Sequence, residues 1–174
     1  MEIRAARPAD AAAVAELKVR AWRAAYAGML PAERLAALDA AAEAEAWRGY
    51  LEAVPPEDRF WVAVEGGAVA GYARAGPCED VDARPGLGEV HGLYVDPARI
   101  ATGLGRALLE HAAADLAARG YDTLVVWHFV GNDRAAGFYE RAGLRPDGTR
   151  RRSPHGVDEV RLRRPLGATG RPST

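Results

Sequence analysis

The segment Val95–His111, "VDPARIATGLGRALLEH", constrains the fold more than any other stretch, because a strand-like end passes through a short loop into a helix. Glycine destabilises the interior of a helix by about 1 kcal/mol relative to alanine. The presence of Gly103 and Gly105 where this helix begins therefore requires a physical explanation. The first amides of a helix lack internal partners and carry partial positive charge, and glycine lets a ligand approach them closely. The pattern indicates either a phosphate-binding helix N-terminus or a tight turn without a ligand.

Two familiar phosphate fingerprints do not match this segment. No Lys-Ser or Lys-Thr pair follows the glycines, which disfavours a nucleoside triphosphate P-loop. A dinucleotide fingerprint needs a third glycine where this chain has Leu108. Another pyrophosphate-bearing ligand is therefore expected.

Hydrophobic periodicity predicts one α/β or α+β domain around a single sheet, with no repeat or second domain. The region 32–54 reads as one helix or as two pieces. We expect the domain to cover residues 1–166 and residues 167–174 to form a flexible tail. Strands are expected at 2–6, 59–64, 68–75, 89–95, 121–130, 144–152 and 156–166, and helices at 7–26, 32–54, 104–120 and 132–143.

Composition excludes several classes of protein. The net charge is −1, so the chain as a whole has no excess of positive charge that would attract nucleic acid or an anionic membrane. The single cysteine, Cys78, rules out an internal disulfide and cannot form a zinc cluster alone, and nothing marks it as a nucleophile. No apolar run approaches the ~20 residues of a membrane span, and the N-terminus lacks the apolar stretch of a signal peptide. We therefore expect a cytoplasmic protein with no metal, nucleic-acid partner or membrane partner.

Two segments, "LYVDPARIATGLGRALL" and "NDRAAGFYERAGL", resemble two motifs of the GCN5-related N-acetyltransferases (GNAT family) in the family's order. The first resembles the acyl-CoA-binding motif. The segments "AWRAAYAGMLPAERLAAL" and "EVRLRRPL" resemble a bacterial subgroup, so the likeness runs from about Ile3 to Leu166. The resemblance implies a twisted, mostly antiparallel mixed sheet, with acyl-CoA entering between two splayed parallel strands. One departure is Ile100, where the family usually has Gln or Arg.

The resemblance also implies which residues hold acetyl-CoA as co-substrate. The pantetheine arm would pair with a strand edge, and the pyrophosphate would lie on backbone amides at the helix start. Asn132 would cap the next helix and contact the arm. Arg99 or Arg106 is a further candidate for a phosphate contact, with solvated surface as the alternative. The strand edge is formed by Leu93, Tyr94 and Val95, and the amides belong to Ile100, Ala101, Thr102, Gly103, Leu104, Gly105 and Arg106.

Tyr139 matches the family tyrosine that lies near the sulfur of coenzyme A. A phenol has a pKa near 10, so it could protonate the departing thiolate at neutral pH, although Tyr139 also fits an ordinary core position. Glu89 is a candidate base for the amine or a surface glutamate. His91, on the same strand face as Glu89, is a second candidate base, and His128 on the other strand is a further one. A backbone N–H near Tyr94 would meet the developing oxyanion.

The first helix, the loop after it and the second helix would roof the acceptor pocket in this family. Trp22, Tyr26 and Trp47 are candidate substrate contacts, while the same helical spacing is typical of core residues. Glu43 and Glu45 would suit a polyamine, or they form a solvated helix face.

The leading hypothesis is an N-acetyltransferase that moves an acetyl group to an amine of a small molecule or peptide by direct attack in a ternary complex. A non-catalytic acyl-CoA-binding or sensing domain is the alternative. A nucleotide-binding domain is disfavoured by the missing P-loop lysine. The resemblance allows a homodimer.

Overall fold

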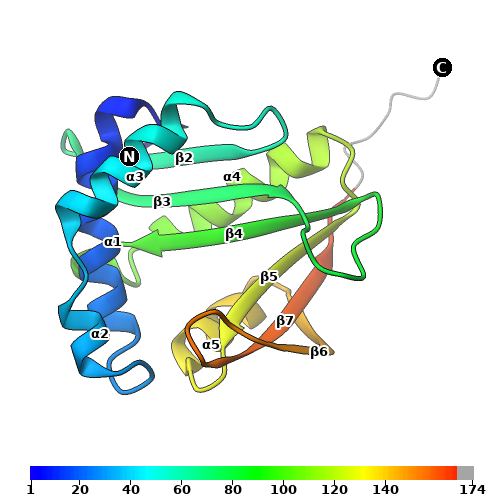
Figure 1. Cartoon of the computed structure of the whole chain (residues 1–174). Coiled ribbons are helices and arrows are strands. Elements are labelled where there is room, and N and C mark those ends of the chain that lie inside the picture. The colour runs from blue at the N-terminus through cyan, green and yellow to red at the C-terminus, as the bar shows by residue number, and fades with distance from the viewer. Residues whose placement is uncertain (168–174) are drawn as a thin grey trace.

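One twisted sheet of seven strands organises the computed structural model, which describes residues 1–167 (Figure 1). The strand order is β1-β2-β3-β4-β5-β7-β6. Except for residue 167, the expected tail lies outside the described residues. The strands are β1 (Glu2–Ala5), β2 (Arg59–Glu65), β3 (Ala68–Pro77), β4 (Leu87–Val95), β5 (Thr123–Phe129), β6 (Arg145–Arg152) and β7 (Asp158–Pro165). The helices are η1 (Pro8–Asp10), α1 (Ala11–Ala25), α2 (Ala32–Ala36), α3 (Ala40–Glu52), η2 (Pro97–Arg99), α4 (Leu104–Ala118) and α5 (Asp133–Arg141).

Strand pairing is antiparallel everywhere except between β4 and β5. These two central strands run parallel and pair only over Leu87–Val90 and Thr123–Val126. Beyond that short contact they diverge, and a V-shaped gap opens between them (Figure 1). The expected mostly antiparallel mixed sheet with splayed parallel strands is confirmed.

Helices cover both faces of the sheet and produce two apolar cores (Figure 1). Helix α4 buries four leucines against strands β2 to β5, as its predicted apolar face requires. On the opposite face α1 packs against α3 and β3, with Val14 and Leu17 fully buried. The leucines of α4 are Leu104, Leu108, Leu109 and Leu116.

The helical region 32–54 forms two helices, α2 and α3, separated at Asp39. The Asp39 carboxylate accepts a hydrogen bond of 2.8 Å from the amide of Ala41, so it starts α3 as an N-cap. Strand β3 runs two residues longer than expected, and β4 begins two residues earlier, at Leu87. Within residues 1–167, no helix combines the length and apolar character needed to cross a membrane.

Strand β4 contains a bulge at His91. Val90 lies opposite Ala75 and Gly92 lies opposite Arg74, so His91 has no partner on β3. An extra residue reverses the alternation of side chains along a strand. Val90 and Leu93, three residues apart, therefore both contact the α4 core.

Candidate active site

A cleft of about 370 Å³ occupies the gap between β4 and β5. Its walls come from α1, β4, the loop before α4, β5 and α5. Beyond Val90, β4 has no ladder with β5, so the edge at Leu93–Val95 keeps main-chain groups free for an extended ligand. The predicted site residues that line it are Tyr26, His91, Leu93, Tyr94, Val95, Ile100, Ala101, Gly103, Gly105, Arg106, Asn132 and Tyr139, and Trp127 and His128 line it as well.

The loop before α4 shows why glycines stand at this helix start. Gly103 is the N-cap residue of α4, with a φ of 90° that favours glycine, and no side chain caps the helix there. A Cβ on Gly105 would lie 3.4 Å from Val95 and 3.6 Å from Phe138, which are ordinary van der Waals distances, so packing inside the protein does not require glycine at this position. The side chain of Leu104 is buried in the α4 core, which leaves only its backbone for a ligand. The first amides of α4 are therefore presented at the cleft without intrahelical partners.

Four arginines stand at the cleft: Arg99, Arg106, Arg134 and Arg141. Arg99 pairs with Glu65 at 3.2 Å, and Arg106 pairs with Glu110 at 2.8 Å. Both side chains remain half exposed beside the amides of the α4 start.

The sequence analysis did not single out Arg134 and Arg141. With Phe138 they follow a spacing of four and three residues, which marks one face of α5, and all three line the cleft. This helical spacing is the signal that could have found them.

Tyr139 lies on α5 and is almost fully buried at the cleft wall. Burial raises the pKa of its hydroxyl well above the ordinary value, so the group stays protonated near neutral pH. Its ring packs near Phe138 and His128. Asn132 caps the same helix by accepting a hydrogen bond of 3.1 Å from the amide of Ala135. The predicted N-cap is confirmed.

Glu89 and His91 form a close pair on β4. Oε1 of Glu89 lies 3.3 Å from Nδ1 of His91, and the side chains are only 6% and 10% exposed. The expectation that they share one strand face is confirmed by this contact. His91 lines the cleft, whereas Glu89 is buried and is not one of the lining residues, so the surface-glutamate alternative is wrong. Nε2 of His91 is buried without a hydrogen-bond partner in the described chain.

Cys78, in the loop after β3, lies close to Glu89. The ligand atoms of Cys78, Asp80 and Glu89 lie within 4.8 Å of one another. Asp80 already accepts hydrogen bonds from Cys78, Trp127 and Arg161. Burial raises the pKa of the thiol to about 12, which keeps Cys78 protonated. Cys78 and Asp80 are thus engaged in hydrogen bonds and Glu89 contacts His91, and the expected absence of a metal stays a prediction.

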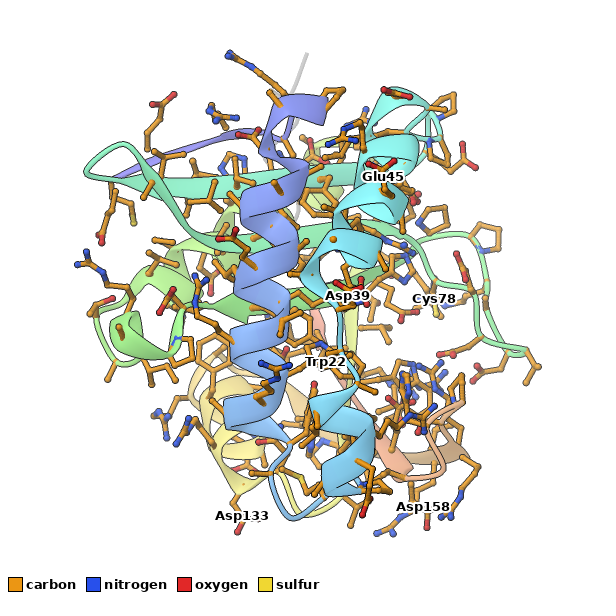
Figure 2. All side chains as sticks on the ribbon, turned by 60° about the vertical axis from the view of Figure 1, so that its left-hand side comes forward. Trp22, Asp39, Glu45, Cys78, Asp133 and Asp158 are labelled. Carbon is orange, nitrogen blue, oxygen red and sulfur yellow. The ribbon has the colours of Figure 1, made fainter. Side chains whose placement is uncertain are left out.

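The aromatic residues of α1 and α3 separate into two groups. Tyr26 lines the cleft, and its hydroxyl lies 3.1 Å from that of Tyr94. Trp22, at the centre of the face shown in Figure 2, packs edge-on against Tyr26 and His155, with ring centroids 5.0 Å apart in both cases. Trp47 instead packs against the core residues Phe60 and Tyr72.

The acidic residues of α3 are paired at the surface. Glu43 forms an ion pair of 2.7 Å with Lys18 of α1. Glu45 pairs with Arg48 one turn along its own helix and lies far from Trp22 in Figure 2. The described structure gives neither residue a place in the cleft wall.

Comparison with known proteins agrees with this geometry. The model of the acetyltransferase (GNAT) family matches residues 17–144, which is most of the chain. The chain belongs to the GNAT family. It is 30% identical to a protein named "Probable N-acetyltransferase" of Mycobacterium tuberculosis over 159 residues, which cover 85% of this chain and 82% of the relative.

Solved structures share the GNAT fold along nearly the whole chain. A PaiA N-acetyltransferase of Thermoplasma acidophilum, crystallised in complex with coenzyme A, superposes with a TM-score of 0.74 at 16% identity. That match covers 92% of this chain and 96% of the other. The ribosomal-protein-S18-alanine N-acetyltransferase of Escherichia coli superposes with a TM-score of 0.68 at 21% identity, covering 99% and 98%.

Proposed function

We propose that this GNAT protein transfers the acetyl group of acetyl-CoA to an amine of a small molecule or peptide in a ternary complex. Family membership supports acetyl transfer as the class of reaction. The observation that carries the proposal is Tyr139, which is almost fully buried at the cleft wall and whose raised pKa keeps its hydroxyl protonated. A non-catalytic binding domain has no need for a proton donor at this position.

The cleft fits acetyl-CoA, which supplies the acetyl thioester. The free edge of β4 at Leu93–Val95 would pair with the pantetheine arm as an added strand does. The amides from residue 100 to residue 106 would hold the diphosphate, and Asn132 would contact the arm. Arg134 and Arg141 add positive charge for the remaining phosphate.

The side chains supply the two proton transfers that acetylation of an amine needs. An ammonium group must lose a proton before it attacks, and the Glu89–His91 pair is the proposed acceptor of that proton. The departing sulfur must gain a proton, and Tyr139 is the proposed donor. Tyr26 lines the cleft at the end of α1, where the acceptor would contact it. Trp22 does not line the cleft and packs edge-on behind Tyr26, which leaves it a supporting role at most.

Replacing Tyr139 with Phe tests the proposal. The thiol released from acetyl-CoA is measured during turnover with polyamines, amino acids, aminoglycosides and peptide N-termini. Loss of a general acid lowers kcat by about 100-fold, while the KM for acetyl-CoA stays close to that of the wild type. Tyr121→Phe, which lies outside the cleft, is the matched control.

Binding is tested separately by thermal unfolding with acetyl-CoA, ATP or NAD. Acetyl-CoA at 100 times its dissociation constant adds about 2.7 kcal/mol to the free energy of unfolding, and the two nucleotides add nothing comparable. Full activity of Tyr139→Phe would remove the acid assignment. Stabilisation by ATP or NAD alone would remove the acetyl-CoA site.

A further inference from the structure

The C-terminal end of α5 is held by arginines from two other elements. Nη1 of Arg106, on α4, donates a hydrogen bond of 3.0 Å to the carbonyl of Arg141. Nη1 of Arg164, on β7, donates one of 2.8 Å to the carbonyl of Ala142. The last carbonyls of a helix lack intrahelical partners and carry partial negative charge, so guanidinium donors stabilise this end. The two arginines therefore attach the end of α5 to α4 and to β7.

One carboxylate, that of Glu110 on α4, pairs with both arginines. Its Oε1 lies 2.8 Å from Nε of Arg106, and its Oε2 accepts a hydrogen bond of 2.7 Å from Nη2 of Arg164. Burial alone would raise the pKa of Glu110, but Arg164 and, to a smaller extent, Arg106 outweigh it and lower that pKa, so the carboxylate is charged near neutral pH. We call these three side chains the α4–α5 clamp.

The position of α5 depends on contacts with its neighbours. The helix has only nine residues, and a helix of that length is marginally stable on its own. Asn132 caps its start, at the end of the helix away from the clamp. Tyr139 lies in the last turn, two residues before Arg141, whose carbonyl the clamp holds. The clamp therefore acts at the end of α5 that carries Tyr139.

We infer that Glu110 is a positioning residue, which aligns Arg106 and Arg164 and so fixes Tyr139 relative to the start of α4. The inference rests on the proposed function, in which the α4 amides hold the diphosphate and Tyr139 protonates the sulfur of the same ligand. A proton donor must lie within hydrogen-bond distance of that sulfur. A displacement of about 1 Å can lower the rate by about 100-fold, so the spacing between α4 and α5 matters for the reaction.

The clamp differs from an ordinary surface ion pair. Exposed pairs on one helix contribute little to stability, whereas Glu110 joins α4, α5 and β7 through two arginines. Arg164 is only 17% exposed. The clamp also gives Arg106 a role other than phosphate contact or solvated surface, because its Nε faces Glu110 and its Nη1 donates to α5.

Amide hydrogen exchange tests the clamp without a substrate. The amides of residues 142–144 donate hydrogen bonds to the carbonyls of residues 138–140, so their exchange reports on the last turn of α5. In Glu110→Ala they should exchange about tenfold faster, because the charged hydrogen bonds that hold this turn are weakened. Asp115→Ala is the matched control and leaves this exchange unchanged, since Asp115 also lies on α4 but pairs with Arg119 of its own helix.

A double-mutant cycle with Tyr139→Phe tests the link to catalysis. Glu110→Ala lowers kcat, measured by the thiol released from acetyl-CoA, by about tenfold or more in the wild-type background. In the Tyr139→Phe background it lowers kcat no further, because the proton donor that it would displace is already gone. A residue that only supports the fold would lower kcat by the same factor in both backgrounds.

Arg164→Met is the second variant, because it removes the donor to Ala142 and lies outside the cleft. It gives the same faster exchange and the same dependence on Tyr139. The inference is overturned if Glu110→Ala matches Asp115→Ala in exchange and in kcat, or if kcat falls equally in both backgrounds. Faster exchange in a protein that acetylates no amine would sustain the clamp and defeat the proposed function, so the two failures are distinguishable.

Discussion

Ala101 has a backbone φ of 67°, and among the described residues it is the one non-glycine residue with a positive φ. Side chains in this region clash with the backbone at a cost of about 1–2 kcal/mol. Ala101 also lines the cleft, next to the amides that are proposed to hold the diphosphate. Strain of this kind is found where a site fixes the shape of a loop.

Ala101→Gly is therefore expected to raise the free energy of unfolding in the absence of ligand by up to about 1 kcal/mol. Glycine relieves the backbone strain of the folded state, but it also stabilises the unfolded chain by ~0.4–1 kcal/mol, and the net gain is the difference between the two. Urea unfolding measures it. Ala114→Gly, on the exposed middle of α4, should instead lower stability by about 1 kcal/mol, and equal effects at the two positions would contradict the strain.

Ile100 leaves the phosphate loop without a side-chain donor at the position where the family usually has Gln or Arg. Its side chain is 41% exposed at the cleft. Ile100→Gln should tighten acetyl-CoA binding by about fivefold, because one hydrogen bond to a charged oxygen contributes roughly 1 kcal/mol or more. Calorimetry measures the change. Val130→Gln, equally exposed but outside the cleft, is the control, and an unchanged Kd for Ile100→Gln would show that the amides alone define the site.

Residue type and spacing were sufficient to predict the residues near the motifs. Alternation along a strand placed Glu89 beside His91, and the pattern at a helix start predicted the cap by Asn132. The bulge at His91 was beyond reach, because it arises only from the pairing of β4 with β3. Trp47 shows a second limit of sequence analysis, because helical spacing does not distinguish a residue that packs in the core from one that lines a cleft.

Among the elements, α5 combines a structural cap with the proposed binding of acetyl-CoA. Asn132 starts the helix, and Phe138, Tyr139 and Arg141 face the cleft from it. Asn132→Ala should lower Tm by about 2–4 °C, because a lost cap costs about 1 kcal/mol in a chain of this size. It should also weaken acetyl-CoA binding.

Asn132→Ser separates the two roles of this residue. Serine is a good N-cap, so Tm returns close to the wild-type value, while the lost amide leaves acetyl-CoA binding weak. Thermal unfolding and calorimetry give the two readouts. Recovery of both by serine would show that the side chain contributes only the cap.

The elements themselves follow from apolar periodicity, and their order and type agree with the expectation. The boundaries were harder to predict. β3 gains Gly76 and Pro77 because they pair with Glu89 and Gly88 of β4, and this long-range contact overrides local turn signals.

At the scale of the whole molecule, a buried cation joins the two halves of the splayed sheet. Arg161 of β7 is 2% exposed and bonds to Asp80 and Asp82 in the loop after β3, and to Asp147 of β6. The direct strand pairing between the halves is limited to the four residue pairs of β4 and β5, so this cluster is a second connection. Removing one partner of a buried ion cluster leaves uncompensated charge, which typically costs about 3–5 kcal/mol.

The cluster predicts how stability depends on pH. The hydrogen bond from Arg161 lowers the pKa of Asp82. Burial alone would raise the pKa of Asp147, but hydrogen bonds from Thr149 and Arg161 outweigh it and lower that pKa too. An aspartate whose pKa is lowered in the folded state stabilises that state at pH values above about 4, the ordinary pKa of the side chain. This stabilisation is lost as the pH falls through the lowered pKa.

Arg161→Met is the variant that tests this dependence. Urea midpoints measured from pH 6 to pH 2 should fall steeply below about pH 4 in the wild type. The variant should be less stable at pH 6 and show a shallower fall. If the urea midpoints of both proteins fell equally as the pH was lowered, carboxylates outside this cluster would account for the acid sensitivity.

The extra residue at His91 has a consequence for anyone comparing chains of this kind by eye. Before it, odd-numbered Glu89 lies on the face of β4 where it contacts His91; after it, odd-numbered Leu93 and Val95 lie on the opposite face, against the α4 core. The alternation of side chains between the two faces of the sheet is therefore reversed beyond His91. An alignment that inserts or omits one residue here would place every later side chain of β4 on the wrong face.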